Sequence, residues 1–373
     1  MRFDVSSTAL LSRLQSISKV IASKNSLPIL DSFLFNLEGN TLTVTASDAE
    51  TRLVTSVDVM NAQGAGLFAV SAKILLDPLK ELPEQPLTFD INDENLEIFI
   101  HFQNGKYNFI GQKGDTYPQQ KPLNDNAISI SMDAQMLLNG ISRSLFATAD
   151  ELRPVMNGVY FDIHTDDLTF VASDGHKLVR LRNLAVKSPE RASFILPKKP
   201  ANLLKNLLAK ESEQVLIKFD DNNAYITCTN FEMVCRLIEG RYPNYNSVIP
   251  QENPFKVTID RISFLNALKR VSVFSNPASS LVKLHLKDSL ITVSAQDIDF
   301  STSAEERIVC QFDGTELSIG FKATYLIEIL GNISSEEIVL ELADPSRAGL
   351  IVPSENDEDE DLLMLLMPMM LND

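Results

Sequence analysis

Hydrophobic and polar positions follow one pattern three times along the chain, with a period of about 125 residues. In each copy an alternating run, typical of a half-buried strand, ends in an aspartate two residues after an alanine. These aspartates are Asp48, Asp174 and Asp297. A lysine then opens an apolar stretch with helical spacing, at Lys73, Lys199 and Lys322. A proline near the end of each copy keeps the same step, at Pro118, Pro243 and Pro368. One domain, triplicated, therefore accounts for the chain.

Within each copy the periodicity predicts two helices and several strands. The expected helices cover residues 8–23, 72–81, 133–148, 198–210, 261–275 and 322–333. Two apolar runs flanking a polar turn predict an antiparallel hairpin at 33–44, 159–171 and 284–293. The fold class is α+β with mainly antiparallel sheets. Polar, proline-containing links at 119–126 and 251–254 predict domains at 1–120, 127–250 and 255–373.

Length and composition fit this organisation and limit the compartment. The 373 residues exceed what one core usually holds. The longest apolar run, 362–371, is too short and too interrupted by proline to cross a bilayer, and the first residues do not read as a secretory signal. The three cysteines lack CxxC spacing, which argues against a disulfide framework or a structural zinc site. We expect a cytoplasmic protein with free, buried thiols.

Charge is distributed unevenly between the predicted helices and the rest of the chain. The formal net charge is −17, which by itself opposes binding to nucleic acid. The six predicted helices nevertheless contain an excess of Lys and Arg over acids. Helix propensity favours Glu as much as Lys, so it does not explain the excess. We interpret the helices as a phosphate-facing surface, and we expect the acidic block at 354–361 to be a mobile, solvated loop.

The segment 173–178 could carry chemistry, because Asp174 and His176 could form an acid–base pair in a hydrolase. No nucleophile motif accompanies them. Asp174 also recurs as Asp48 and Asp297, which favours a structural role in ending a strand. The four histidines have no metal-ligand spacing, and no phosphate-binding loop is present. We therefore predict no catalytic residue, no metal and no cofactor.

The C-terminal segment 367–371 is rich in methionine, which forms adaptable apolar surfaces. If this tail lies near 175–178 and Pro243, the result is an apolar groove with a polar rim, suited to short peptides. The alternative is that the methionines only pack in the core as part of a last strand.

Several segments, in this order and spacing, resemble the bacterial sliding clamps, the beta subunits of DNA polymerase III. The resemblance covers the whole chain. The segments are Leu27-Pro28-Ile29-Leu30, Ser173-Asp174-Gly175-His176-Lys177-Leu178, Gly240-Arg241-Tyr242-Pro243-Asn244-Tyr245, Ile319-Gly320-Phe321-Lys322-Ala323-Thr324-Tyr325 and Met367-Pro368-Met369.

The resemblance implies a closed ring of two chains joined head to tail, with six similar domains around duplex DNA, helices lining the hole and sheets outside. DNA would be held without sequence preference. The residues implied to face DNA are Lys24, Arg153, Lys198, Lys199 and Lys205. The residues implied to close the dimer are Tyr107 and Phe109 on one chain and Val273 and Phe274 on the other.

The resemblance also implies one partner-binding groove per chain. Its expected residues are Met156, Ser173, Gly175, His176, Lys177, Leu178, Pro243, Val248, Tyr325, Ser346, Met367, Pro368, Met369 and Leu371. Ser247 and Ser279 stand where members of the family can carry larger side chains, and Asn372-Asp373 extend the tail.

The resulting hypothesis is a processivity factor that is not an enzyme. The implied partners are double-stranded DNA, a second copy of the chain, the alpha subunit of the replicative polymerase, the clamp loader, and other polymerases and repair proteins with clamp-binding peptides. No membrane is involved. The alternative is a triplicated peptide-binding scaffold that never encircles DNA.

Overall fold

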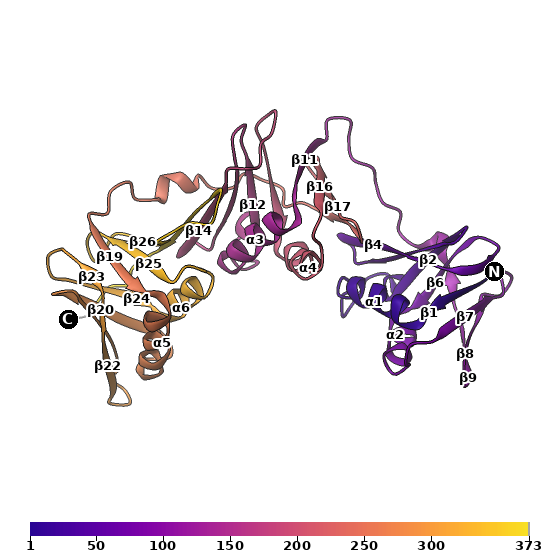
Figure 1. Cartoon of the computed structure of the whole chain (residues 1–373), viewed down its shortest axis with the longest axis horizontal. Helices are drawn as coiled ribbons and strands as arrows, with labels where there is room; N and C mark the ends of the chain where they lie inside the picture. The colour runs from indigo at the N-terminus through magenta and orange to yellow at the C-terminus, as the bar shows by residue number, and fades with distance from the viewer. Residues whose placement is uncertain (372–373) are drawn as a thin grey trace. The chain divides into compact units, whose positions relative to one another are not determined.

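The computed structural model describes residues 1–371; the predicted tail extension, Asn372-Asp373, lies outside the described residues. The chain forms two compact units, which are described separately. Unit 1 comprises Met1–Leu137 and Asn202–Leu237, and unit 2 comprises Leu138–Ala201 and Ile238–Asp373. Figure 1 labels the elements. No helix in the described part of the chain is both long and apolar enough to span a membrane.

The order of elements repeats three times, as the sequence predicts. The first repeat contains β1 (Arg2–Ser6), α1 (Ser7–Ser18), β2 (Ser32–Glu38), β3 (Thr41–Ser47), β4 (Thr51–Asp58), β6 (Gly66–Ser71), α2 (Ala72–Lys80), β7 (Pro86–Ile91), β8 (Glu97–Phe102) and β9 (Gly105–Ile110). It also has the short strands β5 (Met60–Gln63) and β10 (Gln112–Lys113) and the 3₁₀ turns η1 (Pro28–Asp31) and η2 (Gly114–Thr116).

The second repeat contains β11 (Ile128–Asp133), α3 (Ala134–Ser144), η3 (Leu145–Ala147), η4 (Pro154–Met156), β12 (Gly158–Ile163), β13 (Leu168–Ser173), β14 (Lys177–Asn183), β15 (Ala192–Pro197), α4 (Lys198–Leu208), β16 (Gln214–Phe219), β17 (Asn223–Thr227) and β18 (Glu232–Arg236). The 3₁₀ turn η5 (Tyr245–Val248) follows it. The third repeat contains β19 (Phe255–Asp260), α5 (Arg261–Val271), η6 (Ser272–Phe274), β20 (Leu281–Lys287), β21 (Leu290–Asp297), β22 (Thr302–Val309), β23 (Gln311–Phe312), β24 (Leu317–Lys322), α6 (Ala323–Gly331), β25 (Glu337–Leu342), β26 (Gly349–Pro353) and β27 (Glu360–Leu366).

All six predicted helices are present, and each is shorter than expected. The side chains of Ser6 and Asp260 cap α1 and α5 by accepting from the backbone N–H groups of Ala9 and Ser263, at 3.1 Å and 2.7 Å. Two predicted helices end in a separate 3₁₀ turn, η3 after α3 and η6 after α5. The repeating apolar face that predicts a helix continues through such a turn, so sequence periodicity overestimates helix length.

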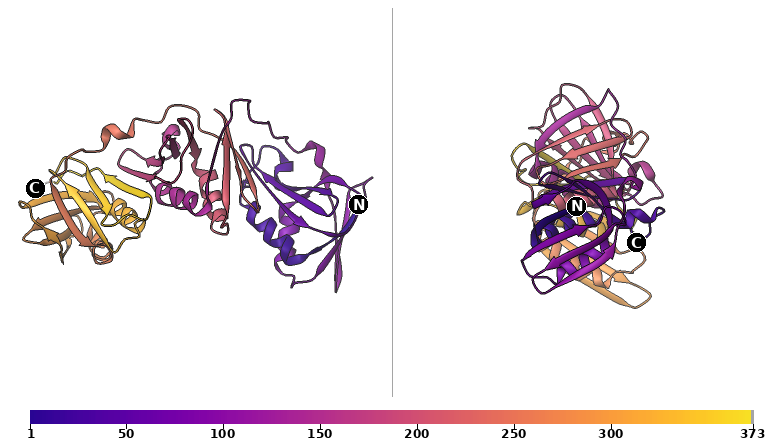
Figure 2. Two further views of the ribbon diagram at one scale, coloured as in Figure 1. Left: turned by 45° about the horizontal axis from the view of Figure 1, so that its top comes forward. Right: turned by 90° about the vertical axis from the view of Figure 1, so that its right-hand side faces the viewer.

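The strands form four sheets, and every described pairing between named strands is antiparallel, which confirms the predicted α+β class. The sheet orders are β5-β1-β7-β8-β9, β10-β6-β2-β3-β4-β18-β17-β16-β11, β15-β12-β13-β14-β27-β26-β25-β19-β23 and β22-β21-β20-β24. Within each unit the helices pack against the sheets and bury apolar side chains there, as α1 does against β3 and β4 and α5 against β21 and β22 (Figures 1 and 2).

Two of the sheets run continuously from one repeat into the next. In unit 1, β4 of the first repeat pairs with β18 of the second, and Leu53 lies opposite Met233. In unit 2, β14 of the second repeat pairs with β27 of the third, and Val179 lies opposite Met364. Among the described residues, the corresponding strands β22 and β9 are left as sheet edges. The chain thus makes the same strand junction twice.

The shared aspartates have the structural role that the sequence predicts. Oδ1 of Asp174 accepts hydrogen bonds from the backbone N–H groups of His176 at 2.8 Å and Lys177 at 2.9 Å. Asp48 and Asp297 make the corresponding bonds in their own hairpins. Each carboxylate therefore closes a turn between two strands.

The predicted solvated acidic loop is confirmed for 354–359, which lie outside helices and strands and are exposed, whereas Glu360 and Asp361 begin β27 and are half-buried. Arg143 at the end of α3 donates to Glu360 at 2.6 Å and to Asp357 at 2.5 Å, and Arg180 of β14 donates to Asp361 at 2.9 Å. Burial raises the pKa of Glu360, although Arg143 beside it acts in the opposite direction. The sequence does not reveal these arginine partners, because they lie far from the acidic segment along the chain.

Candidate protein-binding groove and nucleic-acid interface

The loop between β13 and β14 brings several predicted groove residues together within unit 2. Gly175 adopts a φ of +85°, in the left-handed region that glycine enters without strain. The Ser173 hydroxyl is buried and donates to the Lys177 carbonyl at 2.8 Å. His176 is exposed, and its ring stacks on that of Tyr325 in α6 with centroids 6.2 Å apart. The loop thus presents the imidazole outward on a rigid turn.

Lys177 is the charged centre beneath this loop. Its Nζ lies 2.7 Å from Glu328 of α6 and 3.5 Å from Asp174. The ammonium also lies over the rings of Tyr325 and Phe146, 4.2 Å and 5.7 Å from their centroids. Because its side chain is buried, Lys177 fixes the loop against α6 and does not offer its charge to a ligand.

The C-terminal tail crosses next to this loop. The Met367 backbone N–H donates to the His176 carbonyl at 2.8 Å, and that of Met369 donates to the Gly320 carbonyl of β24 at 2.8 Å. A Cβ atom on Gly320 would lie 2.7 Å from the Met369 carbonyl oxygen, so only glycine lets the tail approach β24 so closely. Met367 and Met370 are exposed, whereas Pro368, Met369 and Leu371 are half-buried. The tail therefore lies as an ordered edge beside the loop.

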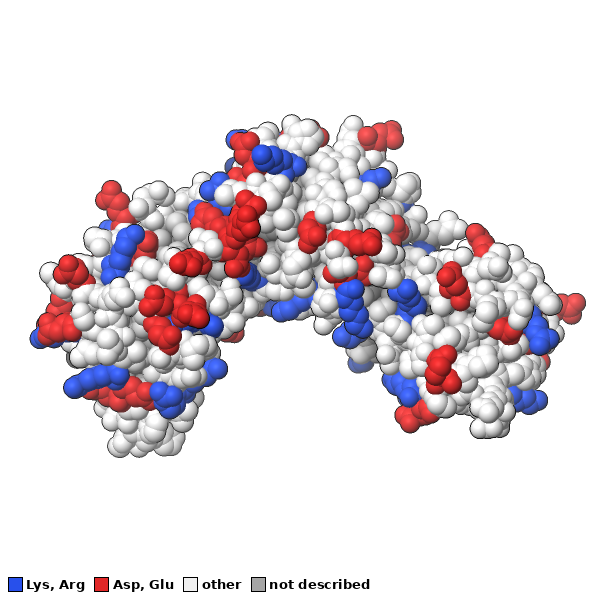
Figure 3. Space-filling view, in the orientation of Figure 1, with Lys and Arg blue, Asp and Glu red and all other residues white. Residues whose placement is uncertain are grey.

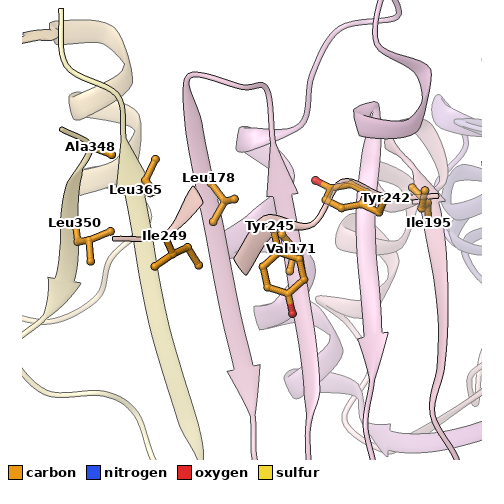
Figure 4. Packing of buried hydrophobic residues seen from close by; sticks show 9 residues of the cluster. All are labelled: Val171, Leu178, Ile195, Tyr242, Tyr245, Ile249, Ala348, Leu350 and Leu365. Atoms are coloured by element: carbon orange, nitrogen blue, oxygen red, sulfur yellow. The ribbon is translucent and has the colours of Figure 1, made fainter. Parts of the chain in front are cut away.

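An apolar cluster supports both segments (Figure 4). Leu178 of β14 and Leu365 of β27 belong to it, together with Tyr242 and Ile249 from the segment that follows the second repeat. Tyr242 stacks on Tyr160 of β12, with ring centroids 4.7 Å apart and an interplanar angle of 4°. This packing holds the segment 242–249 against the face of the sheet that bears Tyr160, Val171 and Leu178, here called the outward face.

The remaining predicted groove residues differ in exposure, and their chain neighbours Tyr242, Ile249 and Ala348 belong to the apolar cluster. Val248, at the end of η5, is exposed, as are Pro243 and Ser346, and Met156 of η4 is half-buried. The Ser346 hydroxyl donates to Asp344 in its own turn at 2.6 Å. The exposed apolar side chains suited to meet a ligand are those of Val248, Met367 and Pro243.

Sequence reasoning missed the residues that hold the turn at 174–176 and the C-terminal tail in place. Glu328 and Phe146 contact Lys177, and Gly320 receives the tail. Glu328 and Phe146 carry no sequence signal, because their partners are distant along the chain. Gly320 has a signal in retrospect, since it lies inside a strand between the apolar residues Ile319 and Phe321, and such a glycine indicates close backbone approach.

The predicted DNA-facing residues differ in their availability. Lys24, Lys199 and Lys205 are exposed, and Lys198 is half-buried at the start of α4. Arg153 is exposed, and its Nη1 donates to the Asp174 carbonyl beside the groove loop. Other basic helix residues are occupied by partners: Arg143 by two carboxylates, Arg270 by Glu306 at 2.6 Å and Arg261 by the Ser335 carbonyl at 2.7 Å. In the view of Figure 3, acidic side chains are scattered among basic ones on both units.

The predicted dimer residues lie at the two open strand edges. Tyr107 and Phe109 are half-buried on the edge strand β9 of unit 1. Val273 and Phe274 are exposed in η6, which contacts the edge strand β22 of unit 2. Exposed apolar side chains beside an unpaired strand are typical of a surface covered in an assembly.

Comparison with known proteins identifies the class. Three family models match successive parts of the chain: the N-terminal, central and C-terminal domains of the DNA polymerase III beta subunit, over residues 1–121, 131–244 and 246–370. The "Beta sliding clamp" of Pseudomonas aeruginosa is 28% identical over 373 residues and all of both chains, and that of Haemophilus influenzae is 27% identical over 375 residues and all of both chains.

Solved structures agree. A crystal structure of the Pseudomonas aeruginosa sliding clamp bound to griselimycin matches with a TM-score of 0.94 at 27% identity over all of both chains. The Thermotoga maritima DNA polymerase III beta subunit matches with a TM-score of 0.90 at 25% identity over all of both chains. The fold is therefore the three-domain clamp fold. The chain belongs to the DNA polymerase III beta subunit family, the sliding clamps, whose members are non-catalytic processivity subunits in DNA replication.

Proposed function

We propose that two copies of this chain close a ring around duplex DNA by pairing β22 of each copy with β9 of the other. The carrying observation is the repeated junction register. In each hairpin, the alanine two residues before the shared aspartate pairs with one residue of the next strand. Ala46 pairs with Leu53, Ala172 with Val179 and Ala295 with Ala304. The three partners therefore occupy equivalent positions in the three repeats. Leu53 pairs with Met233 and Val179 with Met364 across the two covalent junctions.

Tyr107 of β9 is the equivalent of Met233 and Met364. Met233 lies opposite Ile226, Met364 opposite Ile351 and Tyr107 opposite Ile100. Repeating the junction a third time sets Ala304 of one copy opposite Tyr107 of the other. The same register sets Glu305 opposite Lys106, an opposite-charge pair across the strands. It also removes both open edges and covers Phe109.

A disulfide tests this register, because a bridge requires Cα atoms within about 7 Å. Ala304→Cys with Tyr107→Cys should cross-link the purified protein into a covalent dimer on oxidation. Ile308→Cys with Tyr107→Cys is the matched control, since Ile308 lies on the same face of β22 but about 13 Å further along the strand. Cross-linking of the control pair with none in the first pair would refute the register.

We further propose that the ring is held on DNA by Lys24, Arg153, Lys198, Lys199 and Lys205, without sequence preference. Support comes from the exposure of Lys24, Lys199 and Lys205. After loading onto nicked circular DNA, the protein should co-elute with the circle in gel filtration and be lost when the circle is cut. Retention on the linear form would mean that direct affinity, and not enclosure, holds the protein.

Charge reversal separates phosphate contacts from the rest. Replacing Lys198, Lys199 and Lys205 by Glu should reduce DNA retention, since each lost phosphate contact weakens binding and lowers its salt dependence. Peptide binding should be unchanged in the same variant. Equal retention of the variant and the parent would remove these lysines from the DNA surface.

The groove around His176, Val248 and Met367 is proposed to bind short peptides of the polymerase alpha subunit, the clamp loader, other polymerases and repair proteins in the cytoplasm. Its support is the exposed apolar side chains beside a rigid turn. Met367→Ala with Met369→Ala should weaken binding of a clamp-binding peptide about tenfold or more and leave the dimer intact. Unchanged peptide affinity would place the site elsewhere.

A further inference from the structure

Two exposed apolar patches have no role in the contacts described so far. In unit 2, Ile298 and Phe300, in the turn between β21 and β22, are 81% and 75% exposed. In unit 1, Ile74 of α2 and Ile110 at the end of β9 are 53% and 77% exposed. Isolated exposed apolar residues need no explanation, but exposed apolar side chains at the end of an open edge strand indicate a covered surface, and Ile298, Phe300 and Ile110 are placed so.

The repeat shows what the equivalent turns do elsewhere. At the first junction the Glu50 carbonyl accepts from Arg236 N–H at 2.9 Å, and at the second the His176 carbonyl accepts from Met367 N–H at 2.8 Å. Arg236 and Met367 each lie three residues beyond the central junction residues Met233 and Met364. In both junctions, therefore, a carbonyl of the turn accepts a hydrogen bond from the residue just beyond the edge strand of the neighbouring repeat.

The same three-residue offset identifies the residue that the turn of the third repeat would bond across the proposed dimer. The residue three beyond Tyr107 is Ile110. The same equivalence applies to the contact between His176 and Tyr325 of α6. Ala72 begins α2 and Ala323 begins α6, so Ile74 is the equivalent of Tyr325.

The turn of the third repeat has a feature that the other two lack. Only two residues separate Asp48 from Thr51 and Asp174 from Lys177, whereas four, 298–301, separate Asp297 from Thr302. The two extra positions let the turn carry Ile298 and Phe300 further from β22.

We infer that Ile298 and Phe300 of one copy cover Ile74 and Ile110 of the other, forming an apolar contact that locks the head-to-tail dimer. The inference rests on the proposed dimer and adds residues that the sequence did not single out. The occupant of each patch is a second copy of this chain, because both patches are apolar. Ile298 and Phe300 directly precede β22 and Ile110 ends β9, the two strands proposed to pair, and Ile74 is the equivalent of Tyr325, which contacts the neighbouring repeat's turn.

The test compares dimer dissociation constants by sedimentation across a range of protein concentrations. Ile298→Ser with Phe300→Ser should raise the dissociation constant about tenfold to hundredfold, the equivalent of exposing one large apolar side chain. Met60→Ser is the matched control, because Met60 is a comparably exposed apolar residue, at 63%, on β5, which lies at the opposite edge of its sheet from β9. Its dissociation constant should stay within about twofold of the parent's.

A double-mutant cycle adds the partner side. Ile74→Ser alone should weaken the dimer, and combining it with the Ile298→Ser and Phe300→Ser changes should cost less than the sum of the separate effects, since the same contact is lost once. Additive effects would overturn the contact.

The outcomes separate this inference from the proposed dimer. If the loop variant dissociates like the parent while Ala304→Cys and Tyr107→Cys still cross-link, the dimer stands and the apolar contact fails. If the parent is monomeric at all concentrations and does not cross-link, the proposed dimer itself fails. The native thiols interfere little, because burial raises the pKa of both Cys228 and Cys235 to about 12 and also raises that of Cys310.

Discussion

The second and third repeats share a strand order but treat the outward face of the sheet in opposite ways. In the second repeat, Tyr160 lies opposite Val171 and Leu178 opposite Ser173, and the segment 242–249 covers this face. In the third repeat, the equivalent positions are polar. Lys283 lies opposite Ser294, and Ser303 lies opposite Gln296.

This difference leaves an open cleft in the third repeat. It has a volume of about 690 Å³, and its lining includes Leu281, Lys283, Ser294, Gln296, Ser303, Glu305 and Leu371. The fold therefore tolerates either a covered apolar face or an open polar one. The partner-binding site proposed for the second repeat depends on the added layer, whose Tyr242 and Ile249 pack in one cluster with Leu178, the second residue after His176.

The largest expected effect comes from removing the layer. Tyr242→Ala deletes a buried ring that stacks on Tyr160, and such truncations cost about 3–5 kcal/mol. We expect a large drop in the urea midpoint and in peptide affinity. Lys283→Ala, at the position equivalent to Tyr160, should change the free energy of unfolding by no more than about 0.5 kcal/mol. Equal losses in both variants would mean that the two faces contribute alike.

The buried cation at the junction ranks second. Lys177→Ala removes the ion pair with Glu328 and the contact with Tyr325, and we expect a cost of about 1–3 kcal/mol, limited because Glu328 is half-exposed and regains water. Peptide affinity should fall too, since the turn is no longer fixed to α6. Thr302→Ala, at the equivalent position in the third repeat, is the control. A Lys177→Ala protein with unchanged peptide affinity would argue against this positioning role.

The sequence predicts the fold well because its signals are local and repeated. Alternation before Asp48, Asp174 and Asp297 predicts the hairpins, and the carboxylates close the turns as expected. Periodicity finds all six expected helices but extends them too far, both where a helix gives way to a 3₁₀ turn, as at η3 and η6, and at α1, which ends at Ser18.

The site is less predictable because it depends on contacts between distant residues. Lys177 is a polar loop residue in the sequence, yet Glu328 and Phe146 bury it. Arg143 is a helical cation suited to phosphate, yet Asp357 and Glu360 occupy it. In both cases the charge is paired by residues about 150 or more positions away, which no local pattern reveals.

Replacing the polar residues of the third repeat by their counterparts from the second repeat tests whether the polar side chains alone leave this face of the sheet uncovered. Lys283→Tyr, Ser294→Val and Ser303→Leu would reproduce the apolar bed of the second repeat without its cover. We expect a rise in binding of an apolar dye and in self-association, with a change in unfolding free energy below about 1 kcal/mol, since the new side chains stay exposed. If the triple variant binds no dye, then the local tail, including Leu371, already covers the new surface.

The smallest effect is a pH dependence confined to the third repeat. Arg270 donates two hydrogen bonds to Glu306 and lowers the pKa of that carboxyl below its ordinary value of 4.5, whereas the equivalent position in the second repeat is Leu181, which does not titrate. Because the folded pKa is lowered, the stabilisation is present above pH 4.5 and is lost as the pH falls through the lowered value. Glu306→Gln should therefore melt slightly below the parent at pH 7, and the two should converge near pH 3. The pair is exposed, so the difference is small, and high salt should reduce it further.

Both proteins are compared at one concentration, since dimerisation raises apparent stability. A difference that persists at pH 3 would mean that the glutamate stabilises this edge through packing and not through its charge.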